Sequence, residues 1–129
     1  MSERPWVIDG NNVFGSRPDG WWNDRPAAAR RFAQRVAEWS RGHDDPVILV
    51  FDGPVADGTA ELAGGNLRIE VATRRGRDAA DDRIVELVGE LDDARVVTSD
   101  KRLRERLTER CGDRIELTGV GRFRTLIGY

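Results

Sequence analysis

Cysteine and histidine are almost missing from this chain of 129 residues, and each shortage excludes a class of site. Cys111 is the only cysteine, so the chain has no internal disulfide bond and no thiolate zinc site. His43 is the only histidine, which excludes a metal site built from several histidines, and we place it in a polar surface turn. A chain without disulfides suits a reducing compartment, so we expect a cytoplasmic protein.

Long hydrophobic runs are also lacking, since no apolar stretch approaches the ~20 residues that span a bilayer. We therefore expect no membrane association. The first strand is predicted so close to the N-terminus that it leaves no room for a signal peptide. Hydrophobic residues make up 39% and charged residues 34% of the chain, which favours a folded domain over disorder. The length predicts a single domain over residues 1–129.

The charges nearly balance, because 21 basic and 23 acidic residues give a net charge of −2. Net charge alone therefore predicts no polyanionic partner. Lys101 is the only lysine, and all the other basic residues are arginines. Arginine suits bidentate contacts with phosphate, but a GC-rich genome also raises arginine content. The number of arginines therefore does not indicate a phosphate-binding protein, and only the position of each arginine can.

Short apolar runs alternate with longer stretches of helical periodicity. Such alternation predicts a parallel sheet with helices on both faces. The predicted strands are Trp6–Ile8, Val47–Phe51, Leu67–Val71, Arg95–Thr98 and Arg114–Leu117. The predicted helices are Arg25–Arg41, Asp78–Leu91, Asp100–Arg110 and Val120–Ile127, and residues 15–23 and 53–66 are expected to be irregular, with a helical turn near Ala60–Ala63.

Acidic residues follow three of the predicted strands. Asp9 and Asp52 close the first and second strands, and Asp100 comes directly after the fourth. Ligands of open α/β sheets bind outside the carboxyl ends of the strands, so these side chains are expected at one edge. Each could instead be an ordinary helix cap, but a fold has no structural use for so many like charges at one edge.

More acids begin the third predicted helix. Asp78 and Asp82 are four residues apart and share a helix face, and Asp81 lies beside them. Carboxylate oxygens suit hard cations such as Mg²⁺ or Mn²⁺. The sequence therefore predicts an all-oxygen metal site, and it leaves open which of these three acids binds the ion.

Amide and hydroxyl side chains accompany the acids. Asn11 and Asn12 follow Asp9 after one glycine, in what we interpret as a turn. One amide, by preference that of Asn12, can orient Asp9 or a water molecule. Ser99, next to Asp100, either orients the same site or caps the helix that follows.

The segments IDGNNV, VFDG, GRDAADDRIV and VVTSDKRLRERL, in this order and spacing, resemble the NYN domain. This is a branch of the PIN-like nuclease superfamily, and the chain is similar to its small bacterial YacP-like members over roughly residues 6–117. The resemblance implies a three-layer αβα sandwich with a central, mainly parallel sheet, and a metal-dependent ribonuclease. The acidic positions of the family carry over to Asp9, to Asp81 or Asp82, and to Asp100, and its amide carries over to Asn12.

Residue pattern and resemblance together give the following predictions. The catalytic residues are Asp9, Asn12, Asp82 and Asp100. The ligands of Mg²⁺ or Mn²⁺ are Asp9, Asp81, Asp82 and Asp100, with supporting roles for Asp52, Asp78 and Ser99. Basic residues beside these acids would hold RNA phosphates, and they are Arg74, Arg75, Arg77 and Lys101. Trp21 and Trp22 cannot both face one core, so one is available for stacking on a base, unless both pack on the first helix.

The partner predicted from these features is RNA, with the ribosome as a further candidate, for a protein that is a monomer or a weak homodimer. Three alternatives stay open. A flap-type DNA nuclease shares the acids, but residues 53–66 leave little room for its DNA-binding arch. A phosphoaspartyl enzyme of the haloacid dehalogenase type needs a second aspartate where Asn11 stands. A non-catalytic RNA- or ribosome-associated binding module is the alternative from another class.

Overall fold

The computed structural model describes residues 4–72 and 79–129, and within them the strands form one parallel sheet. The strand order is β3-β2-β1-β4-β5. The strands are β1 (Trp6–Asp9), β2 (Val47–Asp52), β3 (Leu67–Ala72), β4 (Ala94–Val97) and β5 (Ile115–Thr118). Each lies within one residue of a predicted apolar run, because a parallel strand covered on both faces is apolar throughout.

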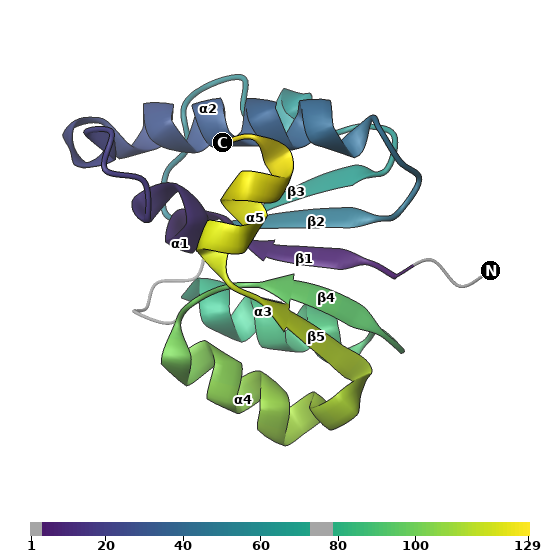
Figure 1. Cartoon of the computed structure of the whole chain (residues 1–129). Coiled ribbons are helices and arrows are strands. Elements are labelled where there is room, and N and C mark those ends of the chain that lie inside the picture. The colour runs from purple at the N-terminus through teal and green to yellow at the C-terminus, as the bar shows by residue number, and fades with distance from the viewer. Residues whose placement is uncertain (1–3, 73–78) are drawn as a thin grey trace.

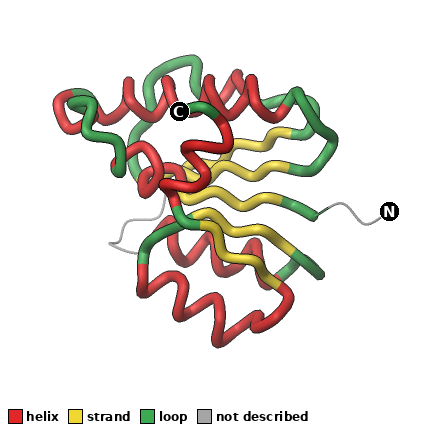
Figure 2. Tube along the Cα trace, viewed as in Figure 1, coloured by secondary structure: helices red, strands yellow, loops and turns green. Residues whose placement is uncertain are grey.

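Helices cover both faces of the sheet, which confirms the predicted three-layer αβα sandwich (Figure 1). One face carries α1 (Gly10–Gly15), α2 (Arg25–Ser40) and α5 (Val120–Ile127), and the other carries α3 (Ala79–Gly89) and α4 (Lys101–Cys111). Short 3-10 turns are η1 (Trp21–Asn23), η2 (Ala60–Leu62) and η3 (Gly112–Arg114). Figure 2 shows the strands lying between the two helical layers. No helix in the described ranges is long and apolar enough to cross a membrane.

Two apolar cores hold the layers together, one on each side of the sheet. Successive residues of β1 point to opposite faces, so Ile8 packs with Phe32 and Phe123 in one core. Val7 packs with Ile84 in the other core. His43, which we expected at the surface, packs its ring against Trp39 at 4.5 Å between centroids, because that turn folds back on α2.

Among the α-helices of the described residues, α1 is the one that the sequence did not predict. We interpreted its residues as a turn, yet they form a short helix that begins at Gly10 directly after β1. A Cβ atom on Gly10 would lie 2.8 Å from the Phe51 ring and 2.9 Å from the Val50 carbonyl oxygen. Only glycine lets α1 start this close to β2, so the residue after Asp9 is set by packing.

The strand order reverses between β1 and β4, and this reversal positions the site. From β1 the chain builds β2 and β3 outward on one side, and it then crosses to build β4 and β5 on the other. Residues Ile8 and Val97 are paired in the register of β1 with β4. The residues that follow them, Asp9 and Thr98, therefore meet at the switch point where ligands of such sheets bind.

Candidate active site

A hollow of about 330 Å³ opens at the carboxyl ends of β1 and β2 and the end of β4. Its lining includes acids from the ends of these strands, amides from the start of α1, and the first turn of α3. The lining residues are Asp9, Asn11, Asn12, Asp52, Ala80, Asp81 and Asp100. Four predicted acids and both predicted amides thus share one hollow, as the parallel sheet requires.

Asp9 lies deepest in the strand end, with only 6% of its surface exposed. Burial raises the pKa of Asp9 from 3.8 to about 7, because a carboxylate loses hydration there. Hydrogen bonds from Thr98 and from the backbone of Asn12 limit this rise in pKa, and the negative charges of Asp81 and Asp100 contribute to it. The site therefore concentrates negative charge against a poorly solvated carboxyl group.

Thr98, which we did not predict as a site residue, joins the two central acids. It is fully buried, and its hydroxyl group donates to Asp9 Oδ2 at 2.9 Å. The same oxygen accepts from the backbone N–H of Asp100 at 3.1 Å. The signal in the sequence is a threonine two positions before an aspartate at a strand end.

The two asparagines connect α1 to the strands on either side of β1. Asn11 Nδ2 donates to the carbonyl oxygen of Asp52 at 2.7 Å, and the N–H of Asp52 donates to Asn11 Oδ1 at 2.8 Å. On the other side, the N–H of Ser99 donates to Asn12 Oδ1 at 2.7 Å. Asn12 Oδ1 is thus engaged by the backbone, which fixes the amide at the lining of the hollow.

Asp100 and Ser99 both cap helices, in addition to any role at the hollow. The Asp100 side chain caps α4 by accepting from the N–H of Leu103 at 2.9 Å. Ser99 Oγ accepts from the N–H of Val120 at 3.0 Å, so it holds the start of α5 and not of the next helix, α4. The cap interpretation and the site interpretation of Asp100 are therefore compatible.

The third helix presents Asp81, and not Asp82, to the hollow. Asp82 forms an ion pair of 2.9 Å with Arg106 of α4, and its side chain is 47% exposed. This corrects our expectation that Asp82 joins Asp9 and Asp100 in the cluster. Successive helical residues diverge by about 100°, so when Asp81 faces the sheet edge Asp82 turns toward α4.

Several predicted residues fall elsewhere. Asp78, Arg74, Arg75 and Arg77 lie outside the described residues. Lys101 is exposed in the first turn of α4, beside the strand end that carries Asp100. A larger hollow of about 610 Å³ opens at the amino ends of β2 and β3, but no strand-end acid lines it.

The donor set of the acidic hollow fits a hard divalent cation in its chemistry. The side-chain oxygens come from carboxylates and amides, and Mg²⁺ binds proteins through one or two carboxylates while it keeps several waters. Across residues 4–72 and 79–129, however, no three His, Cys, Asp or Glu side chains are grouped closely enough to hold a metal ion. Separate carboxylates around a hollow fit an ion that keeps water between itself and part of the protein.

Comparison with known proteins places this chain in a family. The family model described as the YacP-like NYN domain matches residues 6–116. The chain belongs to the YacP-like NYN domains. These domains are a nuclease-type family. The match includes every acid and amide that lines the hollow.

Two solved structures resemble this YacP-like NYN domain along almost its whole length. The crystal structure of Rae1 (YacP) from Bacillus subtilis has 20% sequence identity and a TM-score of 0.74, covering 99% of this chain and 74% of that chain. A point mutant of the same protein has 19% identity and a TM-score of 0.72, covering 97% and 75%. At such identity the likeness establishes the fold. No curated protein matches the chain.

Proposed function

We propose that this YacP-like NYN domain is a metal-dependent ribonuclease that hydrolyses RNA phosphodiester bonds at the acidic hollow. One observation carries the proposal: acids from three strand ends and from α3 line a single hollow at the switch point of the sheet. A nuclease-type family and an oxygen-only donor set support it.

Asp9, Asp81 and Asp100 are the residues that would hold Mg²⁺ or Mn²⁺. When bound, such an ion lowers the pKa of water and neutralises charge on a phosphate. The chain itself supplies the orientation. Thr98 fixes the Asp9 carboxyl group through its 2.9 Å hydrogen bond, and the backbone of Ser99 fixes the amide of Asn12. Asp52 lines the hollow from β2 and adds negative charge beside the proposed ligands.

The neighbouring pair Asp81 and Asp82 tests the proposal with a matched control. Asp81→Asn should reduce Mn²⁺-dependent cleavage of single-stranded RNA by at least about 100-fold, because it removes a charge that faces the hollow. Asp82→Asn makes the same chemical change one residue along, on a side chain paired with Arg106, and should stay within a few fold of wild type. The measurement is the cleavage rate of a labelled RNA in Mn²⁺, with EDTA as the blank.

Asp9→Asn and Asp100→Asn should likewise abolish cleavage while circular dichroism stays native. Equal activity of Asp81→Asn and wild type would remove Asp81 from the site. Loss of cleavage in Asp82→Asn alone would mean that the catalytic residue of α3 is Asp82, on the side of the helix that faces α4.

A non-catalytic RNA-binding module is the second candidate. It is favoured by the lack, in the described ranges, of three acidic or histidine side chains grouped closely enough to hold an ion. This candidate predicts RNA binding that is indifferent to Mn²⁺ and no metal-dependent cleavage by wild-type protein.

A further inference from the structure

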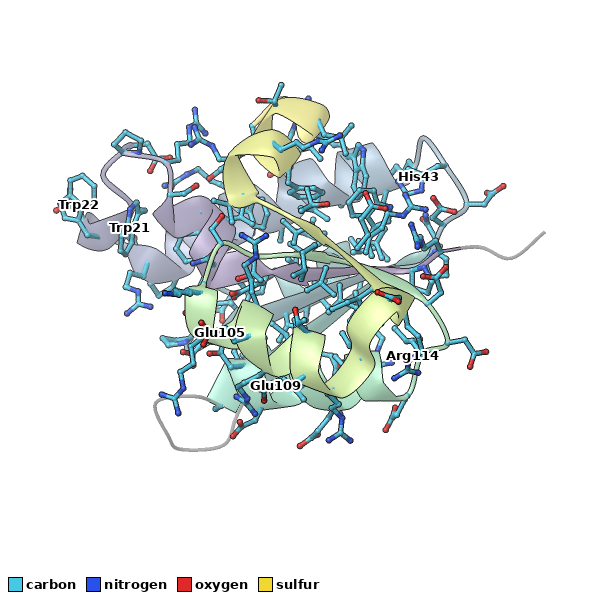
Figure 3. All side chains as sticks on the ribbon, turned by 60° about the horizontal axis from the view of Figure 1, so that its bottom comes forward. Trp21, Trp22, His43, Glu105, Glu109 and Arg114 are labelled. Carbon is cyan, nitrogen blue, oxygen red and sulfur yellow. The ribbon has the colours of Figure 1, made fainter. Side chains whose placement is uncertain are left out.

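Two adjacent tryptophans have separate environments in η1. Trp21 packs edge-on against Phe14 of α1, with 6.0 Å between ring centroids. Trp22 contacts Trp21 at 5.8 Å but remains 59% exposed, and Figure 3 shows both rings at one end of the molecule. More than half of the Trp22 surface thus faces solvent, where a planar ring of a ligand can reach the indole.

The exposed ring lies on the same side of the molecule as the acidic hollow. Helix α1 begins at the hollow and is only six residues long, or about 9 Å. The 3-10 turn η1, which carries Trp21 and Trp22, packs against the far end of this helix through the contact of Trp21 with Phe14. Figure 1 shows α1 and the start of α2 together at the edge where β1 ends. A molecule seated in the hollow can therefore extend toward Trp22.

The helix that follows is basic, although the whole chain is slightly acidic. Helix α2 carries four arginines and one glutamate, so its net charge is +3 in a chain of −2. The glutamate, Glu38, is paired with Arg35 at 2.9 Å. In the described part of the chain no carboxylate lies within ion-pair distance of Arg25 or Arg31, and the Arg25 guanidinium lies 6.0 Å from the Trp21 ring centre.

A third hollow, of about 430 Å³, continues this basic surface along α2. Arg17, Arg31 and Arg35 all line it. Arg17 comes from the same loop as the tryptophans and lies 3.7 Å from Asp19, and its guanidinium stacks over the Tyr129 ring at 4.6 Å. Guanidinium groups gathered around a hollow match phosphate oxygens in both charge and hydrogen-bond geometry.

We propose that Trp22 and the arginines of α2 form a binding surface for single-stranded RNA, outside the acidic hollow. A base stacks on the exposed indole face of Trp22, and Arg25 and Arg31 bind backbone phosphates along α2. The choice of RNA rests on the proposed function. The strand must be single, because a paired base cannot offer its face to an indole ring.

Binding of a labelled oligouridylate, measured by fluorescence anisotropy in EDTA so that no cleavage occurs, tests the surface. Trp22→Ala should weaken binding roughly 5- to 150-fold, the range that loss of one base–aromatic stack covers, while Trp22→Phe should retain most of the affinity. The double variant Arg25→Ala/Arg31→Ala should flatten the slope of log K against log salt by about 1.4, at about 0.7 per phosphate contact.

The matched control is Arg110→Ala/Arg114→Ala, which removes two exposed arginines at the end of α4 and in η3. Figure 3 shows Arg114 at the other end of the molecule from Trp22. The control should leave the salt slope nearly unchanged. The proposed RNA-binding surface would be wrong if both double variants changed the salt slope equally. It would also be wrong if Trp22→Ala bound the oligouridylate as tightly as wild type. Loss of a homodimer in Trp22→Ala without any loss of RNA affinity would contradict it as well.

A separate cleavage assay distinguishes this inference from the proposed function. If wild-type protein cleaves RNA in Mn²⁺ and the Trp22→Ala variant binds RNA as tightly as wild type, the proposed binding surface is wrong and the proposed ribonuclease activity is supported. Wild-type protein that binds RNA through Trp22 and the α2 arginines, but does not cleave it in Mg²⁺ or Mn²⁺, would support the surface and overturn the ribonuclease.

Discussion

The Asp9 carboxyl group is surrounded by features that favour its neutral form. It is buried at a strand end and it faces Asp81 and Asp100, and hydrogen bonds from the Thr98 hydroxyl group and the Asn12 backbone offset these effects only in part. Asparagine has the same shape without the charge. The charged form of Asp9 thus lowers the stability of the metal-free protein, and it adds to the negative charge of the site, as active-site acids commonly do.

Asp9→Asn should therefore stabilise the metal-free protein in a pH-dependent way. The pKa of Asp9 is about 7 when folded and 3.8 as its ordinary value, so the folded state binds the extra proton between these limits. Wild-type free energy of unfolding then falls as pH rises through this window. At about 1.4 kcal/mol per pKa unit, the variant should gain on the order of a few kcal/mol at pH ~8 and little at pH ~4.

Urea denaturation in EDTA at the two pH values measures this difference. Asp82→Asn, on the exposed side chain paired with Arg106, serves as the control and should show no such gain. A variant at Asp9 that is less stable than wild type at the higher pH would mean that the carboxylate is stabilised by contacts in the fold.

The sequence was enough to predict most residues that line the acidic hollow. It was not enough to choose between Asp81 and Asp82 or to find Thr98. Strand-end acids could be predicted, because parallel strands bring their carboxyl ends to one edge. The choice of Asp81 over Asp82 depends on the rotation of α3 about its axis, which its packing on the sheet sets. Thr98 was missed because a buried threonine after two valines is equally typical of an ordinary strand.

Among the elements, α1 depends most on contacts beyond its own residues. Six residues are too few for a helix to be stable alone, and its sequence begins and ends with glycine. The paired hydrogen bonds between Asn11 and Asp52 hold it against β2, and Gly10 permits the close approach. This is why local pattern predicted a turn there, whereas the strands and the long helices were predicted nearly to their ends.

Gly10→Ala should lower the free energy of unfolding by roughly 1–3 kcal/mol, the usual cost of overpacking. The added methyl group would lie 2.8 Å from the Phe51 ring and must push α1 away from β2. Gly121→Ala is the control, because a methyl group there meets open space in helix α5 and should be neutral or stabilising by up to about 1 kcal/mol. Equal stability of the two variants in urea denaturation would show that α1 can shift without cost.

For the whole molecule, the proposed metal site links ion binding to stability. A ligand that binds only the folded state stabilises it by about 2.7 kcal/mol at a concentration 100 times its Kd. Millimolar Mn²⁺ should thus raise the Tm of wild type by several degrees relative to EDTA. Asp100→Asn should lose most of this increment, whereas Asp82→Asn should keep it.

Differential scanning fluorimetry of the three proteins measures the increment directly. A wild-type Tm indifferent to Mn²⁺ and Mg²⁺ would contradict the metal site and place the RNA-binding module ahead of the ribonuclease.

The placement of β1 in the middle of the sheet also fixes an order of events in synthesis. The hydrogen bond from Thr98 to Asp9 joins positions 89 residues apart. A ribosome makes the N-terminal side first, so β1, β2 and β3 emerge while the edge of β1 that will receive β4 still has unpaired N–H and C=O groups. Whatever chemistry the hollow performs, a growing chain cannot perform it until β4 has docked, and the same exposed edge makes an unfinished chain prone to wrong pairing.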